Sequence, residues 1–192
     1  MSEVLALPRP TTKRDLLTYD DYVTFPDQDG IRKEIIEGEL YMTPAPATKH
    51  QLIVLRLAKI LDDYVLQYDL GTILISPFDV IFSNLNVIQP DILFISKENS
   101  KILTDLNAKG APDLIVEILS PATMDNDRIY KKLVYEKSGV KEYWIVDSRN
   151  NVVEVWILKD KRYRLYVQAG EEQRLKSQLF RELEIDLDSV FM

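Results

Sequence analysis

The sequence contains no cysteine and only one histidine among its 192 residues. Without cysteine the chain forms neither disulfides nor thiolate metal sites, which agrees with a reducing compartment. It also lacks a continuous apolar run of about 18 residues, and its first residues, MSEVLALPRPTTKR, lack the long apolar segment and small-residue cleavage site of a signal peptide. We therefore expect a soluble, cytoplasmic protein with no membrane segment.

Basic side chains are fewer than acidic ones: 24 lysines and arginines against 31 aspartates and glutamates, which gives a net charge of −7. An acidic protein has no overall positive field to attract a polyanion, which argues against avid binding of nucleic acid. A local groove can still be basic, however. A site built from carboxylates adds negative charge until a metal ion neutralises it.

The length and a hydrophobic content of 46% are enough for one well-buried core. Residues 1–17 contain Pro8 and Pro10 and show no sustained periodicity, so we expect an N-terminal arm there. Since no repeat, low-complexity tract or interdomain linker follows, we expect one domain over residues 18–192.

Two helices and a pair of strands are expected in the first third of the domain. Thr18 precedes two aspartates and resembles a helix N-cap, after which Tyr22, Val23 and Phe25 are expected to face a core. Residues 31–42 favour two short strands or one bulged strand. Residues 49–68 predict a long helix, because apolar residues that include Leu52, Leu55, Ile60 and Val65 repeat there at helical spacing without glycine or proline.

The rest of the chain predicts a sheet and one further helix. The segments TILIS, FDVIF, DILFIS and DLIVEILS, the last two separated by a polar link at 97–112, are expected to form the central sheet. A helix over 125–138 is followed by Gly139, and strands resume in EYWIVD, NVVEVWIL and RYRLYVQ. The pattern predicts an α/β or α+β domain with a mixed central sheet flanked by helices.

Two carboxylates stand in this strand-rich sequence, Asp91 in QPDILFIS and Glu117 in PDLIVEILS. Side chains alternate between the faces of a strand, so Glu117 shares a face with Ile115 and Leu119 and interrupts an otherwise apolar segment. If the two strands are neighbours, both carboxylates can bind one divalent cation such as Mg²⁺. Alternatively, Asp91 only caps a turn after Pro90, and Glu117 pairs with a lysine at a sheet edge.

The runs QPDILFIS, APDLIVEILSPAT and DRIYKKLVYEKSGVKEYWIVD resemble the Uma two family of putative restriction endonucleases, part of the PD-(D/E)XK nuclease superfamily. The earlier run EIIEGELYMTPAPATKHQLIV resembles the N-terminal block of the same family. Together the matching runs extend from about Glu34 to Asp147. The resemblance implies a restriction-endonuclease-like fold and a metal-dependent nuclease activity.

The resemblance also implies roles for particular residues. Asp91, Glu117 and the backbone carbonyl of Ile118 would hold Mg²⁺, with Mn²⁺ as a substitute. Two residues after Glu117, where the superfamily usually has a lysine, this sequence has Leu119, which can neither orient water nor stabilise phosphate. Lys131 lies at a matching family position on the following helix and would replace that lysine.

Each further candidate has a simpler alternative. Lys131 can instead form a solvated ion pair with Asp127 four residues earlier, and its neighbour Lys132 points about 100° away around the helix. Glu34 could contact a metal or water, or be an exposed strand carboxylate beside Lys33. The single histidine, His50, could contact phosphate or transfer a proton, or serve as a local hydrogen-bonding residue near a helix start.

Other residues of the matching runs are expected to have structural roles. Asp113 is too far along the strand, about 13 Å from position 117, to bind the same ion as Glu117. Core packing is expected for Tyr135, Tyr143 and Trp144.

The leading hypothesis is a Mg²⁺-dependent endonuclease that hydrolyses phosphodiester bonds of DNA. The alternative is a catalytically impaired module of the same fold that binds DNA or a protein partner, and RNA or a branched nucleic acid is a further substrate class. Because cutting both strands of a duplex needs two sites, a homodimer is also expected, with the β-rich C-terminal third as its interface.

Overall fold

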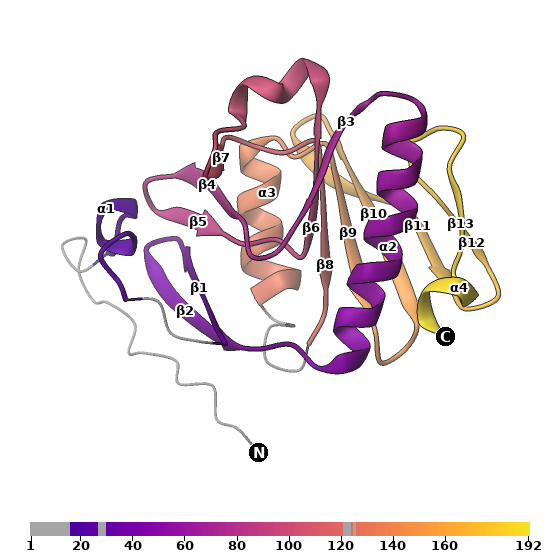
Figure 1. Cartoon of the computed structure of the whole chain (residues 1–192), viewed down its shortest axis with the longest axis horizontal. Coiled ribbons are helices and arrows are strands. Elements are labelled where there is room, and N and C mark those ends of the chain that lie inside the picture. The colour runs from indigo at the N-terminus through magenta and orange to yellow at the C-terminus, as the bar shows by residue number, and fades with distance from the viewer. Residues whose placement is uncertain (1–15, 27–29, 121–123, 125) are drawn as a thin grey trace.

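A computed structural model describes residues 16–26, 30–120, 124 and 126–192 (Figure 1). Most of the expected N-terminal arm, residues 1–15, lies outside the described residues. Within the described part, no helix is long and apolar enough to cross a membrane.

A six-stranded sheet forms the centre of the molecule, with strand order β11-β10-β9-β8-β6-β3. Strands β8 and β9 are parallel and the other neighbours are antiparallel, which confirms the expected mixed sheet. Its strands are β3 (Gly71–Ile75), β6 (Ile92–Ser96), β8 (Leu114–Ile118), β9 (Glu142–Asp147), β10 (Val152–Lys159) and β11 (Arg162–Gly170).

Helices cover both faces of this sheet (Figure 1). Leu114, Val116 and Ile118 of β8 pack in the same cluster as helix α2 (Thr48–Gln67), while Ile115 packs with residues of helix α3 (Lys132–Ser138) on the other face. The alternation expected for β8 is therefore confirmed. A strand buried on both faces reads as a nearly continuous apolar run.

Helix α2 is confirmed and begins one residue before the expected start. Its core contacts come from Ile53, Leu57, Leu61 and Val65, spaced four residues apart. Leu52 and Leu55, which belong to the same apolar repeat, are 41% and 64% exposed. Apolar residues occur on several sides of this helix, and the docking on the sheet selects the buried one.

A second, five-stranded sheet has the order β2-β1-β5-β4-β7 and packs on the α3 side of the central sheet. FDVIF belongs to this sheet, so its expected place in the central sheet was wrong. It turns back immediately to pair with β5 and runs parallel to β7, a strand inside the polar link. The strands are β1 (Ile31–Ile36), β2 (Glu39–Pro44), β4 (Asp79–Ser83), β5 (Asn86–Ile88) and β7 (Asn107–Lys109).

Residues 31–42 form two strands, the hairpin β1–β2, and not one bulged strand. Glu37 and Gly38 both have positive φ, 52° and 81°, as a tight two-residue turn of the I′ type requires. The backbone N–H of Leu17 donates to the carbonyl oxygen of Gly38 at 2.9 Å, so the end of the expected arm joins the fold.

Helix α1 (Tyr19–Tyr22) begins with the expected cap, because the side chains of Thr18 and Asp21 form a reciprocal capping box. Tyr22 is buried in a small core cluster. Val23 is 59% exposed, so its expected core contact was wrong, and Phe25 is half-buried. The helix ends at Tyr22, so Val23 and Phe25 lie beyond its last turn.

The helix expected over 125–138 consists of a π-helical segment, η2 (Asn126–Lys131), followed by α3; residue 125 lies outside the described residues. Gly139 ends α3 in the left-handed conformation with φ 91°, as expected. Single π-helical turns occur frequently at functional sites. Here η2 carries both Asp127 and Lys131.

The remaining elements lie at the edges of the central sheet. A 3₁₀ helix, η1 (Lys97–Ile102), begins the polar link. The C-terminal segment contains β12 (Arg174–Lys176), β13 (Glu184–Asp186) and α4 (Asp188–Phe191), and its apolar side chains extend the core beside α2.

Candidate active site

Asp91 and Glu117 lie opposite each other on neighbouring strands of the central sheet. The register pairs Ile92 of β6 with Val116 of β8, and one further step along both strands pairs Asp91 with Glu117. Both carboxylates are buried, at 2% and 1% exposure. Because β8 lies between β6 and β9, the alternative that placed Glu117 at a sheet edge was wrong.

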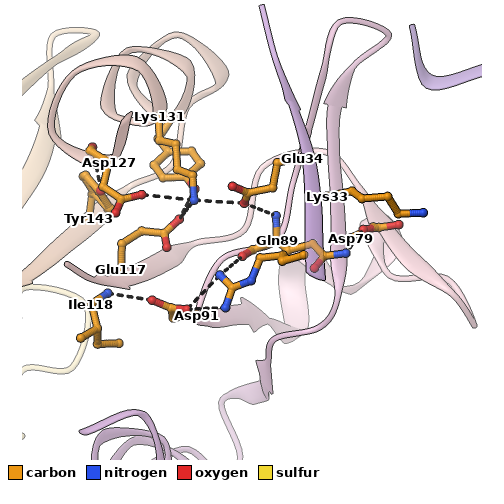
Figure 2. A network of polar contacts seen from close by, with 12 residues as sticks. Lys33, Glu34, Asp79, Gln89, Asp91, Glu117, Ile118, Asp127, Lys131 and Tyr143 are labelled. Atoms are coloured by element: carbon orange, nitrogen blue, oxygen red, sulfur yellow. Dashed lines mark hydrogen bonds and ion pairs between the residues drawn. The ribbon is translucent and has the colours of Figure 1, made fainter. Parts of the chain in front are cut away.

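Asp91 is held by three donors from distant parts of the chain. Both terminal nitrogens of Arg32 lie 3.0 Å from Oδ1, and His50 Nε2 lies 3.0 Å from Oδ2. The backbone N–H of Ile118 donates to Oδ2 at 2.8 Å (Figure 2). Burial acts to raise the pKa of Asp91, but the hydrogen bond from His50 and the charge of Arg32 lower it to about 2.

Glu117 faces a different set of partners on the α3 side. Its Oε1 accepts a hydrogen bond from the Tyr135 hydroxyl at 2.6 Å and lies 3.1 Å from the Lys131 ammonium. Burial raises the pKa of Glu117 well above its ordinary value, and the neighbouring carboxylates add to this against the opposing charge of Lys131.

The Lys131 ammonium lies among three carboxylates, 3.1 Å from Glu117, 3.0 Å from Glu34 and 3.2 Å from Asp127 (Figure 2). The ion pair with Asp127 that was considered as an alternative is present. It is not solvated, since the Lys131 side chain is only 2% exposed. Thus the same lysine makes both the local pair and the contact with Glu117.

The neighbouring lysine has a separate environment, as the helical geometry predicted. The Lys132 ammonium lies over the ring of Trp156, 2.9 Å from its centroid. Leu119, at the position where the superfamily usually has a lysine, is 3% exposed and packs in the apolar cluster with Val134 and Tyr135.

Glu34 enters the site from β1 of the second sheet. It is 3% exposed, so the alternative of an exposed strand carboxylate was wrong. Besides its contact with Lys131, its Oε1 accepts the backbone N–H of Gln89 at 2.9 Å. Glu34 therefore links the second sheet to Lys131 of η2.

His50 lies near the start of α2 and reaches Asp91 through Nε2. Its Nδ1 is buried and has no hydrogen-bond partner among the described residues. His50, Arg32 and Asp91 border a cleft of about 910 Å³, whose other walls come from α1, the β1–β2 hairpin, α2 and the segment 75–79. The cleft therefore lies on the Asp91 side of the site.

The remaining matched residues lie outside this cluster or have structural contacts. Asp113, at the other end of β8, accepts the backbone N–H of Ser96 at 2.8 Å and pairs with Lys141. Tyr143 and Trp144 are fully buried, as expected, and the Tyr143 hydroxyl donates to the carbonyl oxygen of Asp127 at 3.0 Å. Core packing was also expected for Tyr135, whose hydroxyl in addition contacts Glu117.

The donor types present fit a hard divalent cation. Within the described part of the chain, no group of three or more His, Cys, Asp or Glu side chains is arranged to hold a metal ion. Mg²⁺, however, usually takes one or two carboxylates and keeps several waters. Asp91 and Glu117 could provide such carboxylates, and in a strand the Ile118 carbonyl is expected at the same edge as its N–H, which donates to Asp91.

The sequence did not single out Arg32 or Gln89, and it did not predict a site contact for Tyr135. Arg32 and Glu34 alternate on the same face of β1, with Lys33 between them. That spacing was visible in the sequence. Their target was not, because β1 reaches Asp91 and Lys131 only when the second sheet packs on the first.

Comparisons with known proteins found a matching family model and similar solved structures. The Uma2 family model, described as "Putative restriction endonuclease", matches residues 19–188. Among solved structures, the chain is similar to the crystal structure of a putative nuclease belonging to DUF820 from Anabaena variabilis, with a TM-score of 0.75 and 20% sequence identity. The match covers 91% of this chain and 97% of that one, which shows a shared fold. A search of curated proteins found no match.

Proposed function

Because the chain belongs to the Uma2 family of putative restriction endonucleases, we propose that it is a divalent-metal-dependent nuclease that hydrolyses phosphodiester bonds of DNA. The observation that carries this proposal is the placement of Asp91 opposite Glu117 on adjacent strands, with the Lys131 ammonium 3.1 Å from Glu117. Buried ion pairs add little net stability to a fold. Two carboxylates and one buried cation at the end of these strands are therefore better explained by phosphate chemistry than by stabilisation of the core.

Asp91, Glu117 and the carbonyl of Ile118 would hold Mg²⁺. When bound, the ion would polarise the scissile phosphate and lower the pKa of a nearby water. The chain's own groups prepare the ligands. The Ile118 N–H and His50 fix the orientation of the Asp91 carboxylate, and Arg32 helps to keep it ionised at neutral pH.

Lys131 would serve as a fixed positive charge beside the reacting phosphate. Burial acts to lower its pKa, but the surrounding carboxylates, Glu117 foremost, raise it well above its ordinary value. A lysine that stays protonated cannot remove a proton from water. We therefore propose that Lys131 stabilises negative charge on the phosphate and positions Glu117. It would take the role of the lysine that usually stands at the position of Leu119.

DNA is the proposed substrate despite the net charge of −7. Neutralising the carboxylates with metal reduces the negative charge at the site, and the cleft provides Arg32 and Lys33 beside it. Cleavage of both strands further calls for the homodimer expected above, which light scattering of the purified protein would detect.

A plasmid-nicking assay tests the proposal. Supercoiled plasmid is incubated with purified full-length protein in Mg²⁺ or in chelator. Glu117→Gln should slow nicking by about 100-fold or more. Its matched control is Glu142→Gln, which changes another glutamate of the central sheet with 1% exposure, at the opposite end of the neighbouring strand.

Wild-type protein and the control should nick the plasmid at the same rate, and only with Mg²⁺. Circular dichroism would establish that both variants are folded at the assay temperature. Equal nicking by wild type and Glu117→Gln would point to a contaminating nuclease and contradict the proposal.

One observation favours a second function, a catalytically impaired module that binds DNA or a protein partner. Both carboxylates are already paired with cations of the protein, Arg32 and Lys131, while the usual lysine position is Leu119. Calorimetric titration with Mn²⁺ separates the two functions. Binding that disappears in Glu117→Gln supports the nuclease, and no carboxylate-dependent binding supports the module.

A further inference from the structure

Arg32 forms an ion pair with the buried Asp91. It is the second residue of β1, and both of its terminal nitrogens lie 3.0 Å from Asp91 Oδ1. One of them also donates to the carbonyl oxygen of Gln89 at 3.2 Å. The Arg32 side chain is 20% exposed, whereas the Asp91 side chain is 3% exposed.

Both oxygens of Asp91 are therefore engaged before any metal arrives. Oδ1 accepts from Arg32, and Oδ2 accepts from His50 and from the backbone of Ile118. A divalent cation that uses Asp91 must displace at least one donor. The Ile118 N–H is fixed by the strand, and the imidazole of His50 comes from helix α2.

The donor with the most freedom to leave is Arg32. Its guanidinium carries a permanent positive charge, so a divalent cation at Asp91 repels the guanidinium. The same cation does not repel the uncharged backbone amide of Ile118 in this way. Its side chain is long, and it borders the cleft of about 910 Å³, which provides solvated space for the displaced group.

We propose that Arg32 is an exchangeable counter-ion that neutralises Asp91 while the site is empty, and that it withdraws into the cleft when a divalent cation binds. This inference rests on the proposed metal-dependent function. Arg32 is then a positioning residue that keeps Asp91 ionised and oriented, and it sets the metal concentration at which the site loads. Removing it should tighten metal binding, whereas a residue that merely supports the ligand would weaken binding when removed.

Isothermal titration of the metal-free, full-length protein with Mn²⁺ tests this. Arg32→Met should bind Mn²⁺ about tenfold or more tightly than wild type, because the ion no longer has to displace a charge-assisted hydrogen bond. Lys33→Met is the matched control. It removes the same charge from the adjacent residue in the same cleft, where the Lys33 ammonium donates to the carbonyl oxygens of Phe25 and Pro26.

This control separates direct competition between Arg32 and the metal ion from a general effect of removing one positive charge. The affinity of Lys33→Met for Mn²⁺ should stay within about twofold of wild type. Arg32→Lys keeps the charge but loses the paired nitrogen contacts, so it should give an intermediate affinity and covers the case in which Arg32→Met does not fold. Thermal unfolding in chelator shows which variants are folded.

Equal or weaker Mn²⁺ binding by folded Arg32→Met and Arg32→Lys would overturn the exchange but leave the proposed nuclease intact. Equal tightening by Arg32→Met and Lys33→Met would also overturn it, because charge alone would then explain the effect. If wild type and all variants fail to bind Mn²⁺, the metal-dependent function and the role of Arg32 fail together.

Discussion

Asp91 and Glu117 face each other across two adjacent strands and are equally inaccessible, yet their surroundings differ. Asp91 lies beside the cleft and pairs with Arg32, whose side chain is 20% exposed. Glu117 lies on the α3 side and pairs with Lys131, whose side chain is 2% exposed. The pKa of Asp91 is lowered to about 2, whereas that of Glu117 is raised well above its ordinary value.

The difference shows that burial alone does not decide the charge of a carboxyl group. Burial is the largest influence on both groups and acts in the same direction on both. Asp91 overcomes it with three donors, Arg32, His50 and the Ile118 N–H, which reach its two oxygens. Glu117 shares one lysine with two further carboxylates, so less of the stabilising charge is available to it.

The largest expected effect comes from removing the shared cation on the Glu117 side. Lys131→Met leaves three buried carboxylates without the ammonium that pairs with them, and should cost about 3–5 kcal/mol of unfolding free energy. Urea unfolding in the presence of chelator measures this loss. Lys132→Met, which removes an ammonium stacked on Trp156, should cost about 1 kcal/mol or less; an equal loss in both variants would contradict the account of Lys131.

On the Asp91 side, the expected loss is smaller and depends on pH. A pKa lowered from 3.8 to about 2 means that ionised Asp91 stabilises the fold by about 2 kcal/mol above pH 4. This contribution should disappear as the pH falls from about 4 toward 2. Urea unfolding across this range should show the advantage of wild type over Asp91→Asn shrinking with acidification.

For Glu117, the change of stability with pH should have the opposite sign. Because its folded pKa lies above 4.5, its contribution to stability is present below that pH and is lost as the pH rises through the raised pKa. The stability of wild type relative to Glu117→Gln should therefore fall with increasing pH in chelator. If the stability differences of Asp91→Asn and Glu117→Gln from wild type change in the same direction with pH, the proposed contrast between the two carboxylates is wrong.

The smallest expected effect concerns the hydroxyl group on Glu117. Tyr135→Phe removes a 2.6 Å hydrogen bond to a carboxyl group and should cost about 1.5 kcal/mol. Tyr143→Phe removes a 3.0 Å bond to a neutral carbonyl oxygen and should cost about 1 kcal/mol or less. Thermal and urea unfolding would rank the two, and the reverse order would argue that Tyr135 matters only for packing.

The spacing of apolar residues along the sequence predicted individual helices and strands. The alternation along β8, the extent of α2 and the end of α3 at Gly139 all follow from residues within one element. The same patterns did not identify which sheet FDVIF joins. That choice depends on pairing with β5 and β7, and β7 lies more than twenty residues further along the chain.

The site shows the same limit. The sequence neighbours of Glu34 and Lys131 fit an exposed carboxylate and a solvated ion pair as well as they fit a site. Both are buried since β1 of the second sheet packs against η2 and the central sheet, which brings Glu34 within 3.0 Å of Lys131. Arg32 reaches Asp91 through the same packing. Long-range docking therefore determines the charge environment that local sequence cannot specify.

The most direct test of the account is a crystal structure of the protein soaked in Mn²⁺, with anomalous diffraction used to locate the ion. The account predicts one strong peak within coordination distance of Asp91 and Glu117, with the Arg32 guanidinium displaced from Asp91. A fully soaked crystal with no peak between these two carboxylates, and with Arg32 still bonded to Asp91, would contradict it.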